Sequence, residues 1–170
     1  MEYKFIEDDF IPPFDVVEDH FILRKLTVDE VEKDFNALMS SKESLRQIFS
    51  IDDDWPKDTM TIEENYRDLK IHQDEFDNRE GFAYTVVNKE DTECIGCVYI
   101  WPWIHGTYDS LVFYWVTDKV KLLGFEDQLG VYLNKWLKEF WRFEHPLMPG
   151  RNISLIQWEK MVEEIKKVKE

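Results

Sequence analysis

Residues 115–141 read WVTDKVKLLGFEDQLGVYLNKWLKEFW, and this stretch decides the fold. It predicts the end of a strand, a short loop with one glycine at position 124, and an amphipathic helix. The free backbone N–H groups at the start of a helix hold a phosphate group in many proteins. Glu126 and Asp127 lie in the first helical turn, which raises the question of whether this helix accepts an anion. The apolar stripe that would pack the helix on a sheet has the spacing 4, 3, 1, 3, 1, 3: Phe125, Leu129, Tyr132, Leu133, Trp136, Leu137 and Phe140.

The chain before residue 81 has the pattern of one strand followed by helices. The expected strand lies within residues 15–26. Each helical segment that follows opens with a Ser/Thr-x-x-Glu capping box, which satisfies free N–H groups at a helix start: Thr27 with Glu30, Ser40 with Glu43, and Thr61 with Glu64. The last of these helices is predicted to bury a stripe of Ile62, Tyr66, Leu69 and Phe76.

After residue 81 the hydrophobic period changes to two, which indicates strands. Residues 81–89 and 94–101 are expected to pair as a hairpin, and the continuous apolar run 110–117 to be buried on both faces. A short edge strand within 143–148 and a helix over 153–168 complete the pattern. The sequence thus predicts a single α/β domain over residues 1–170, of the mixed α+β kind, with a central, mostly antiparallel sheet flanked by helices.

Composition and charge limit the partners of the chain. Its 170 residues have a net charge of −15, which argues against nucleic acid and anionic membranes as ligands. No apolar run approaches the roughly 20 residues that cross a bilayer, and the acidic start lacks the layout of a signal peptide, so we expect a cytoplasmic protein. Residues 51–80 hold eleven Asp or Glu against four Lys or Arg, a net of −7. That segment is either a solvated helix face or a wall that attracts a cationic substrate such as an amine.

Both cysteines, Cys94 and Cys97, lie in one expected strand. Residues three apart on a strand point to opposite faces, so the two sulfur atoms are expected to diverge. The sequence has no second Cys pair that would complete a zinc site. We therefore interpret the two cysteines as buried structural thiols and expect no metal.

Known catalytic and glycine-rich phosphate motifs are missing from the sequence, so the order of elements and a few short matches remain as guides. These matches are ECIGCVYI (93–100), FYWVT (113–117), and KLLGFEDQLGVYLNKWL (121–137). With them, the chain resembles the GCN5-related N-acetyltransferase (GNAT) family, nearest to its ribosomal-protein and aminoglycoside acetyltransferase-like branch. The likeness covers roughly residues 20–165 and implies the GNAT-like acyl-CoA N-acyltransferase fold.

The resemblance implies acetyl-CoA as the donor substrate, with its diphosphate at the loop before residue 125. The family pattern there is Arg or Gln, two residues, Gly, one residue, then Gly or Ala. Lys121 and Gly124 match it, whereas Glu126 departs from it and would repel the diphosphate. Lys119, Lys121 and Arg151 can offset that repulsion. The coenzyme-binding residues implied by the resemblance are Trp115, Val116, Thr117, Lys121, Gly124, Phe125 and Asn152.

For catalysis the resemblance implies direct transfer, in which a base takes a proton from an attacking amine and an acid protonates the leaving thiolate. This branch often keeps a Glu at the position of Leu111. Asp109, two residues earlier, is the nearest replacement, and it is either a catalytic base or the cap of a turn. Tyr114 is a candidate acid, or else a core aromatic with a solvated hydroxyl.

Two functions stay open. The first is an N-acetyltransferase, a monomer or homodimer, that moves an acetyl group from acetyl-CoA to an amine of a small molecule or protein. The second is a catalytically inactive GNAT-like binding or interaction module. Leu111, Glu126 and the lack of the strands that commonly follow the family's last helix favour the second function. An unrelated α/β enzyme is a third class, for which the sequence offers no motif.

Overall fold

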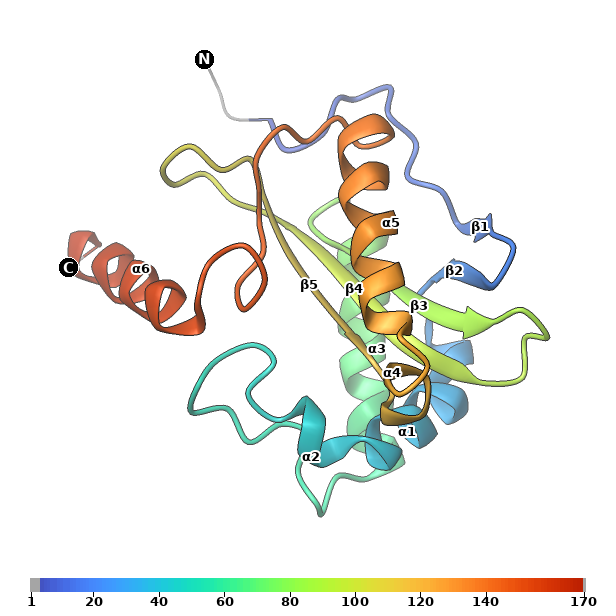
Figure 1. The fold of residues 1–170 in the computed structure, drawn as a ribbon. Coiled ribbons are helices and arrows are strands. Elements are labelled where there is room, and N and C mark those ends of the chain that lie inside the picture. Colours follow the sequence, from blue (N-terminus) through green and yellow to red (C-terminus); the bar gives the residue numbers. More distant parts are fainter. Residues whose placement is uncertain (1–3, 170) are drawn as a thin grey trace.

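The computed structural model describes residues 4–169 and contains one open six-stranded sheet with helices on both faces (Figure 1). The strands lie side by side in chain order, and every neighbouring pair is antiparallel except the last, β5 with β6, which is parallel. This confirms the predicted mixed, mostly antiparallel sheet. The elements are β1 (Asp15–Val17), β2 (Phe21–Lys25), the 3-10 turn η1 (Val28–Glu30), α1 (Val31–Ser40), α2 (Lys42–Leu45), α3 (Ile62–Asp77), β3 (Phe82–Asn88), β4 (Cys94–Pro102), β5 (Ser110–Val116), α4 (Asp118–Lys121), α5 (Phe125–Glu139), β6 (Pro146–Leu147) and α6 (Leu155–Val168).

Side chains of β5 alternate between two hydrophobic cores, because successive residues of a strand point to opposite faces. Helix α5 covers one face of the sheet, while α1 and α3 cover the other (Figure 1). All seven residues of β5 are buried, as the continuous apolar run predicts. The core under α5 includes Val112, Tyr114, Val116, Leu129 and Leu133. The core on the opposite face includes Leu38, Leu69, Phe113, Trp115 and Trp158.

Only one of the two capping boxes predicted for the longer helices forms. Thr61 and Glu64 exchange both hydrogen bonds, each 3.2 Å long, at the start of α3. Thr27 makes no cap hydrogen bond and precedes the 3-10 turn η1 instead of a helix. The Glu30 carboxylate accepts a hydrogen bond from Arg24 at 3.3 Å instead, so a long-range ion pair replaces the local cap.

Two further expectations about helices are wrong. Ser40 caps no helix, because its hydroxyl donates at 2.7 Å to the carbonyl of Ala37 within α1. Tyr66 was expected to be buried in α3, but it is 47% exposed. Asn65 is buried in its place, since its amide donates at 2.9 Å to the Asp34 carboxylate of α1. The buried face of α3 therefore consists of Asn65, Leu69 and Phe76, and the contact with Asp34 adds a polar residue to the predicted stripe.

The two cysteines are free and buried, as predicted, but their expected divergence is wrong. Cys94 and Cys97 both belong to the core on the α1 and α3 side. The ladder between β3 and β4 shifts register between Val86 and Val87, where Ile95 is the extra residue. Such a bulge changes the alternation of side chains by one position, which brings both thiols to the same face.

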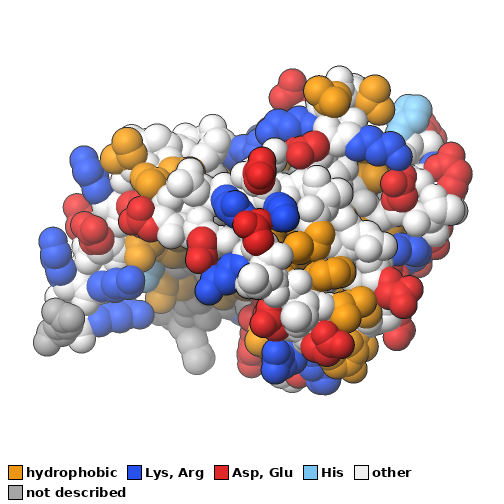
Figure 2. Space-filling view, turned by 90° about the horizontal axis from the view of Figure 1, so that it is seen from below, with side chains coloured by type: hydrophobic (Ala, Val, Ile, Leu, Met, Phe, Trp, Pro, Cys, Tyr) orange, Lys and Arg blue, Asp and Glu red, His pale blue; other side chains and the backbone are white. Residues whose placement is uncertain are grey.

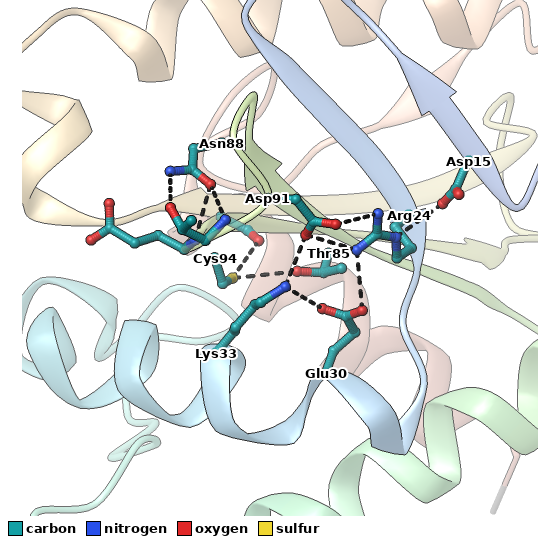
Figure 3. A network of polar contacts seen from close by, with 11 residues as sticks. Asp15, Arg24, Glu30, Lys33, Thr85, Asn88, Asp91 and Cys94 are labelled. Atoms are coloured by element: carbon teal, nitrogen blue, oxygen red, sulfur yellow. Dashed lines mark hydrogen bonds and ion pairs between the residues drawn. The ribbon is translucent and has the colours of Figure 1, made fainter.

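A network of charges joins the edge of the sheet to α1 (Figure 3). Arg24 of β2 donates to both carboxylate oxygens of Asp91 at 2.9 Å and to Asp15 of β1 at 3.1 Å. Lys33 of α1 also binds Asp91, at 2.8 Å, and Arg24 reaches Glu30 of η1. These bonds connect the β1–β2 hairpin, the β3–β4 turn and the start of α1, and so fix α1 over the sheet.

Acidic and basic side chains are interspersed on the face shown in Figure 2, where neither sign forms a continuous stripe. Nucleic-acid-binding proteins usually carry a basic stripe or patch, and this face offers none among the residues described. No helix between residues 4 and 169 combines the length and apolar character needed to cross a membrane. Over the same residues, no group of three or more His, Cys, Asp or Glu is arranged to hold a metal ion.

Candidate functional site

The candidate site lies where β5 and β6 separate, beside the start of α5. Strand β6 pairs with only the first two residues of β5, Ser110 and Leu111. Beyond Leu147 the chain turns away through residues 148–153. Within the described part of the chain, residues 112–116 of β5 therefore have no ladder partner on this side. Their outward backbone N–H and C=O groups border a gap, and such groups bind a partner of some kind.

The start of α5 has free N–H groups close to this gap. Gly124 is the N-cap and has φ +80° and ψ +13°, a left-handed conformation that glycine adopts without strain. It provides no side-chain cap, whereas α3 and α6 begin with complete capping boxes at Thr61 and Ser154. Phe125 packs edge-to-face on Phe21 with ring centroids 5.6 Å apart, which anchors the helix start. The first turn of α5 is thus held in place by packing, while no side chain of the described residues caps its N–H groups.

Positive side chains neutralise the carboxylate of Glu126 in that first turn. Arg151 donates to Glu126 at 2.8 Å, and the Lys121 ammonium lies 3.4 Å from the same carboxylate. Partial burial acts to raise the pKa of Glu126, but the hydrogen bond and charge of Arg151, helped by Lys121, outweigh it and lower that pKa. Lys119, which the sequence offered as a further counter-charge, binds Glu93 at 3.0 Å instead. Two positive side chains therefore offset Glu126, while Asp127 adds a second negative charge to the same turn.

Arg151 also lies across the gap between the strands. Its Nη2 donates to the backbone carbonyl of Tyr114 at 3.0 Å, and its guanidinium carbon lies 3.9 Å from the centre of the Tyr114 ring. The side chain is 24% exposed. A ligand that hydrogen-bonds along this edge of β5 would have to replace the guanidinium at the Tyr114 carbonyl. The sequence predicts that Arg151, in the turn PGR at 149–151, reaches the start of the helix. It does not predict the bond from Arg151 to the Tyr114 carbonyl of β5.

Tyr114 fits under α5 because the helix has a glycine there. A Cβ atom on Gly130 would lie 2.7 Å from the Tyr114 hydroxyl oxygen, closer than any real contact of this kind. Burial raises the pKa of Tyr114, and the nearby Arg151 charge lowers it by less. The phenol therefore keeps its proton at neutral pH, a requirement for a group that is to donate one.

Replacing Gly130 with alanine is expected to destabilise the protein by about 1 kcal/mol, because the added methyl overpacks the Tyr114 hydroxyl. In an unconstrained helix the same change stabilises by about 1 kcal/mol, so the sign itself is diagnostic. Urea unfolding measures the difference. Adding Tyr114→Phe, which removes the clashing oxygen, should restore most of the loss. A Gly130→Ala variant that is more stable than the wild type would show that the hydroxyl lies elsewhere.

Asp109 lies at the other end of β5 from Tyr114, about 17 Å away for five residues of extended chain. Its carboxylate accepts hydrogen bonds from the backbone N–H groups of Glu144 at 2.6 Å and His145 at 3.1 Å, and from the Ser110 hydroxyl at 3.1 Å. These bonds hold the turn before β6, in keeping with the turn-capping alternative. The structure does not bring the two catalytic candidates together, and their catalytic roles stay predictions.

The other predicted coenzyme-binding residues contribute little accessible side chain. Trp115 is 1% exposed and points away from α5, with its indole N–H donating to the Tyr99 hydroxyl at 3.0 Å. Val116 and Thr117 are buried as well. The Asn152 side chain makes two hydrogen bonds of 2.8 Å that tie down the turn after β6. These residues border the gap, and a ligand there would contact their backbone atoms.

Solved structures that resemble this chain include acetyltransferases. A ribosomal-protein alanine acetyltransferase from Vibrio fischeri is 16% identical, with a TM-score of 0.57 over 73% of this chain and 67% of that one. The ribosomal-protein alpha-N-acetyltransferase RimL in complex with coenzyme A is 17% identical, with a TM-score of 0.57 over 72% and 67% of the two chains. A microcin self-immunity acetyltransferase in complex with acetyl-CoA and AMP is 14% identical, with a TM-score of 0.57 over 76% and 69%.

No protein-family model matches the sequence, and no curated protein is significantly similar to it. The fold is that of the GCN5-related N-acetyltransferases, as the order of elements predicts. At these identities the likeness defines the architecture, so any activity has to be argued from the residues of the site.

Proposed function

We propose that the protein is an N-acetyltransferase that moves an acetyl group from acetyl-CoA to an amine. One observation carries the proposal: among residues 4–169, the edge of β5 beyond Leu111 has no strand partner and lies beside a helix start with a glycine cap and no side-chain cap. This edge offers hydrogen bonds to an extended, amide-containing chain, and the helix start offers N–H donors to a diphosphate. Two acetyltransferases of the same fold are described with coenzyme A or acetyl-CoA. We place the reaction in the cytoplasm, as the sequence suggests.

In this proposal the diphosphate lies on the first-turn N–H groups of α5, and the pantetheine arm lies along residues 112–116. Lys121 and Arg151 supply the positive charge, since both already surround Glu126. Arg151 would exchange its bond to the Tyr114 carbonyl for one to a phosphate oxygen. A guanidinium binds phosphate oxygens in a two-pronged geometry, which suits this exchange.

The proposed reaction is a direct transfer. The neutral amine nitrogen forms a bond to the acetyl carbon, the carbon–sulfur bond breaks with its electron pair on sulfur, and the nitrogen loses one proton while the thiolate gains one. The Tyr114 hydroxyl is the proposed acid, supported by its raised pKa and by the Arg151 guanidinium, which lies over the Tyr114 ring. Asp109 lies about 17 Å from Tyr114 and its carboxylate is occupied by the turn before β6, so water is the proposed proton acceptor for the amine.

The alternative function, a GNAT-like binding module without catalysis, is favoured by one observation. Arg151 already fills the gap and bonds to the backbone that a pantetheine arm would need. If this bond is permanent, the protein has the acetyltransferase architecture and binds no donor.

Replacing Lys121 with glutamate is expected to weaken acetyl-CoA binding about tenfold, because it reverses one charge beside the proposed diphosphate position. Lys119→Glu is a matched control, since it makes the same change two residues away on a side chain that binds Glu93. Calorimetric titration of both variants with acetyl-CoA measures the effect. Equal affinities of the two variants, or no binding by the wild type at millimolar acetyl-CoA, would contradict the proposed site.

A further inference from the structure

A second cavity lies on the opposite face of the sheet from α5. It has a volume of about 290 Å³ and lies between α1, α3, the loop before α3 and strand β4. This size suits a ligand of a few heavy atoms, at the lower end of the range for small-molecule sites. Its acidic and large aromatic lining residues include Asp34, Phe49, Trp55, Asp68, Tyr99 and Trp101.

Aromatic rings form one wall of the cavity. The Phe49 ring lies 5.4 Å from both Trp55 and Tyr99, and Tyr99 stacks on Trp101 with ring centroids 5.4 Å apart. His72 packs against the Tyr99 ring from α3 at 5.3 Å. The faces of aromatic rings attract cations, and a wall of several rings is a common way to hold an ammonium group.

Two carboxylates also line the cavity. Asp34 of α1 is only 3% exposed, and the bond described for it is the one from the Asn65 amide. Asp68 lies one helical turn after Asn65 on α3 and is half-buried. Burial raises the pKa of Asp34 to about 6 and also raises the pKa of Asp68. Neither carboxylate has a Lys or Arg partner within ion-pairing distance in the described structure, so a cation in the cavity would relieve an unfavourable arrangement of like charges.

We propose that this cavity holds the ammonium group of the acetyl acceptor, and that the acceptor is a small aliphatic diamine. The role of the diamine as acetyl acceptor rests on the proposed function, since the amine outside the cavity is the one that would be acetylated. A diamine can keep one ammonium group between the rings and the carboxylates while its other amine, once it has lost a proton, acts as the nucleophile. A negative net charge of the chain, and the −7 of residues 51–80, favour the approach of such a cation.

The cavity lies close to the strand proposed to hold the donor. Tyr99 pairs with Phe113 of β5 across the sheet, so the cavity wall is one strand spacing, roughly 5 Å, from β5. The Tyr99 hydroxyl accepts the hydrogen bond from the Trp115 indole. The Phe49 ring of the cavity lies 5.0 Å from the Phe113 ring of β5, so the free end of a diamine has to pass these two side chains to reach the donor strand.

Calorimetric titration without coenzyme tests the binding step. The probes are the linear five-carbon diamine, the amino alcohol of the same length and the corresponding diol, which carry two, one and no positive charges. We expect the diamine to bind with a dissociation constant of about 1 mM or below, and the diol at least about tenfold more weakly. Equal binding of diamine and diol, or no binding of any of the three, would overturn the inference.

Two acidic residues of α3 provide matched variants. Asp68→Asn should weaken diamine binding about fivefold or more by removing a charge at the cavity. Glu63→Gln removes a charge from an exposed residue of the same helix that does not line this cavity, and should leave binding unchanged. If both variants weaken diamine binding equally, the net charge of the protein attracts the diamine and the cavity does not bind it. That result would overturn the inference.

The acetyl-CoA site and the diamine site can be refuted independently of each other. Diamine binding without acetyl-CoA binding would refute the transferase and keep the cation site, whereas acetyl-CoA binding without diamine binding would do the reverse. If both bind, mass spectrometry of the diamine after incubation with acetyl-CoA should show the mono-acetylated product. Binding of both without that product would contradict the assignment of the diamine as acceptor.

Discussion

Replacing Arg151 with glutamate is expected to weaken acetyl-CoA binding about 100-fold. The change removes one positive charge beside the proposed diphosphate, adds a negative one, and leaves Glu126 with Lys121 as its remaining cation. A unit charge about 5 Å from a phosphate contributes about 3 kcal/mol at an effective dielectric constant of about 20, and solvent reduces this further. Calorimetric titration with acetyl-CoA measures the loss, and thermal unfolding without ligand shows whether the variant is folded.

The variant Arg151→Gln distinguishes two roles of Arg151, blocking the gap or binding the diphosphate. If the guanidinium only blocks the gap, Arg151→Gln would release the Tyr114 carbonyl and bind acetyl-CoA as tightly as the wild type or more tightly. If Arg151 holds the diphosphate, Arg151→Gln should bind about tenfold more weakly, between the wild type and Arg151→Glu. Tighter binding by either variant would therefore contradict the proposed coenzyme contact.

Replacing Asp34 with asparagine is expected to stabilise the protein by about 2–3 kcal/mol at pH 7.5. The pKa of Asp34 is raised from 3.8 to about 6, chiefly by burial, and each pKa unit corresponds to about 1.4 kcal/mol. Asn65 opposes this rise by donating to the carboxylate, while the carboxylates of Asp68 and Glu30 add to it. The amide oxygen that the substitution introduces can still accept from Asn65, whereas its NH2 group needs an acceptor at the cavity, so about 2–3 kcal/mol is the upper end of the expected gain.

The sign of the pH dependence follows from the raised pKa of Asp34. Above pH 6 the carboxylate is ionised in both states and the folded protein bears the full penalty. As the pH falls from about 6 to 3.8 the folded state binds the proton first, so the wild type gains stability relative to Asp34→Asn. The buried thiols of Cys94 and Cys97 also face Asp34 but stay neutral throughout this range, because burial raises their pKa values.

Urea unfolding of both proteins between pH 4 and 8 checks this prediction. Glu32→Gln is a matched control, since it neutralises an exposed carboxylate of the same helix and should change stability little at any pH. A loss of stability in Asp34→Asn at pH 7.5, or a difference that does not shrink toward pH 4, would contradict it. A residue that destabilises the fold and lines a cavity is typical of a functional site, which is why Asp34 supports the cation proposal.

The sequence was sufficient for elements whose signals are local. The wide apolar stripe from Phe125 to Leu137, the turn residues between β3 and β4, and the capping box of Thr61 with Glu64 all predicted what the structure shows. The same kind of signal failed at Thr27, because Glu30 binds the distant Arg24 instead of the adjacent backbone. Local patterns predict a helix start well when no long-range partner competes for the side chain.

The candidate sites depended on contacts between distant parts of the chain. Gly124 and Lys121 could be recognised because the loop and helix are contiguous. The bond from Arg151 to the Tyr114 carbonyl joins segments 37 residues apart, and the bond from Asn65 to Asp34 joins segments 31 residues apart. One signal for the second cavity was present: Asn65, Asp68 and His72 lie on one face of α3, where a purely structural helix would have apolar residues.

A structure of the protein with acetyl-CoA is the most direct test of the proposed donor site. We expect the diphosphate on the N–H groups of Phe125, Glu126 and Asp127, the pantetheine arm along residues 112–116, and Arg151 moved from the Tyr114 carbonyl to a phosphate oxygen. If instead Arg151 keeps its bond to that carbonyl and the coenzyme binds elsewhere or not at all, the chain has the architecture of the acetyltransferases without their donor site.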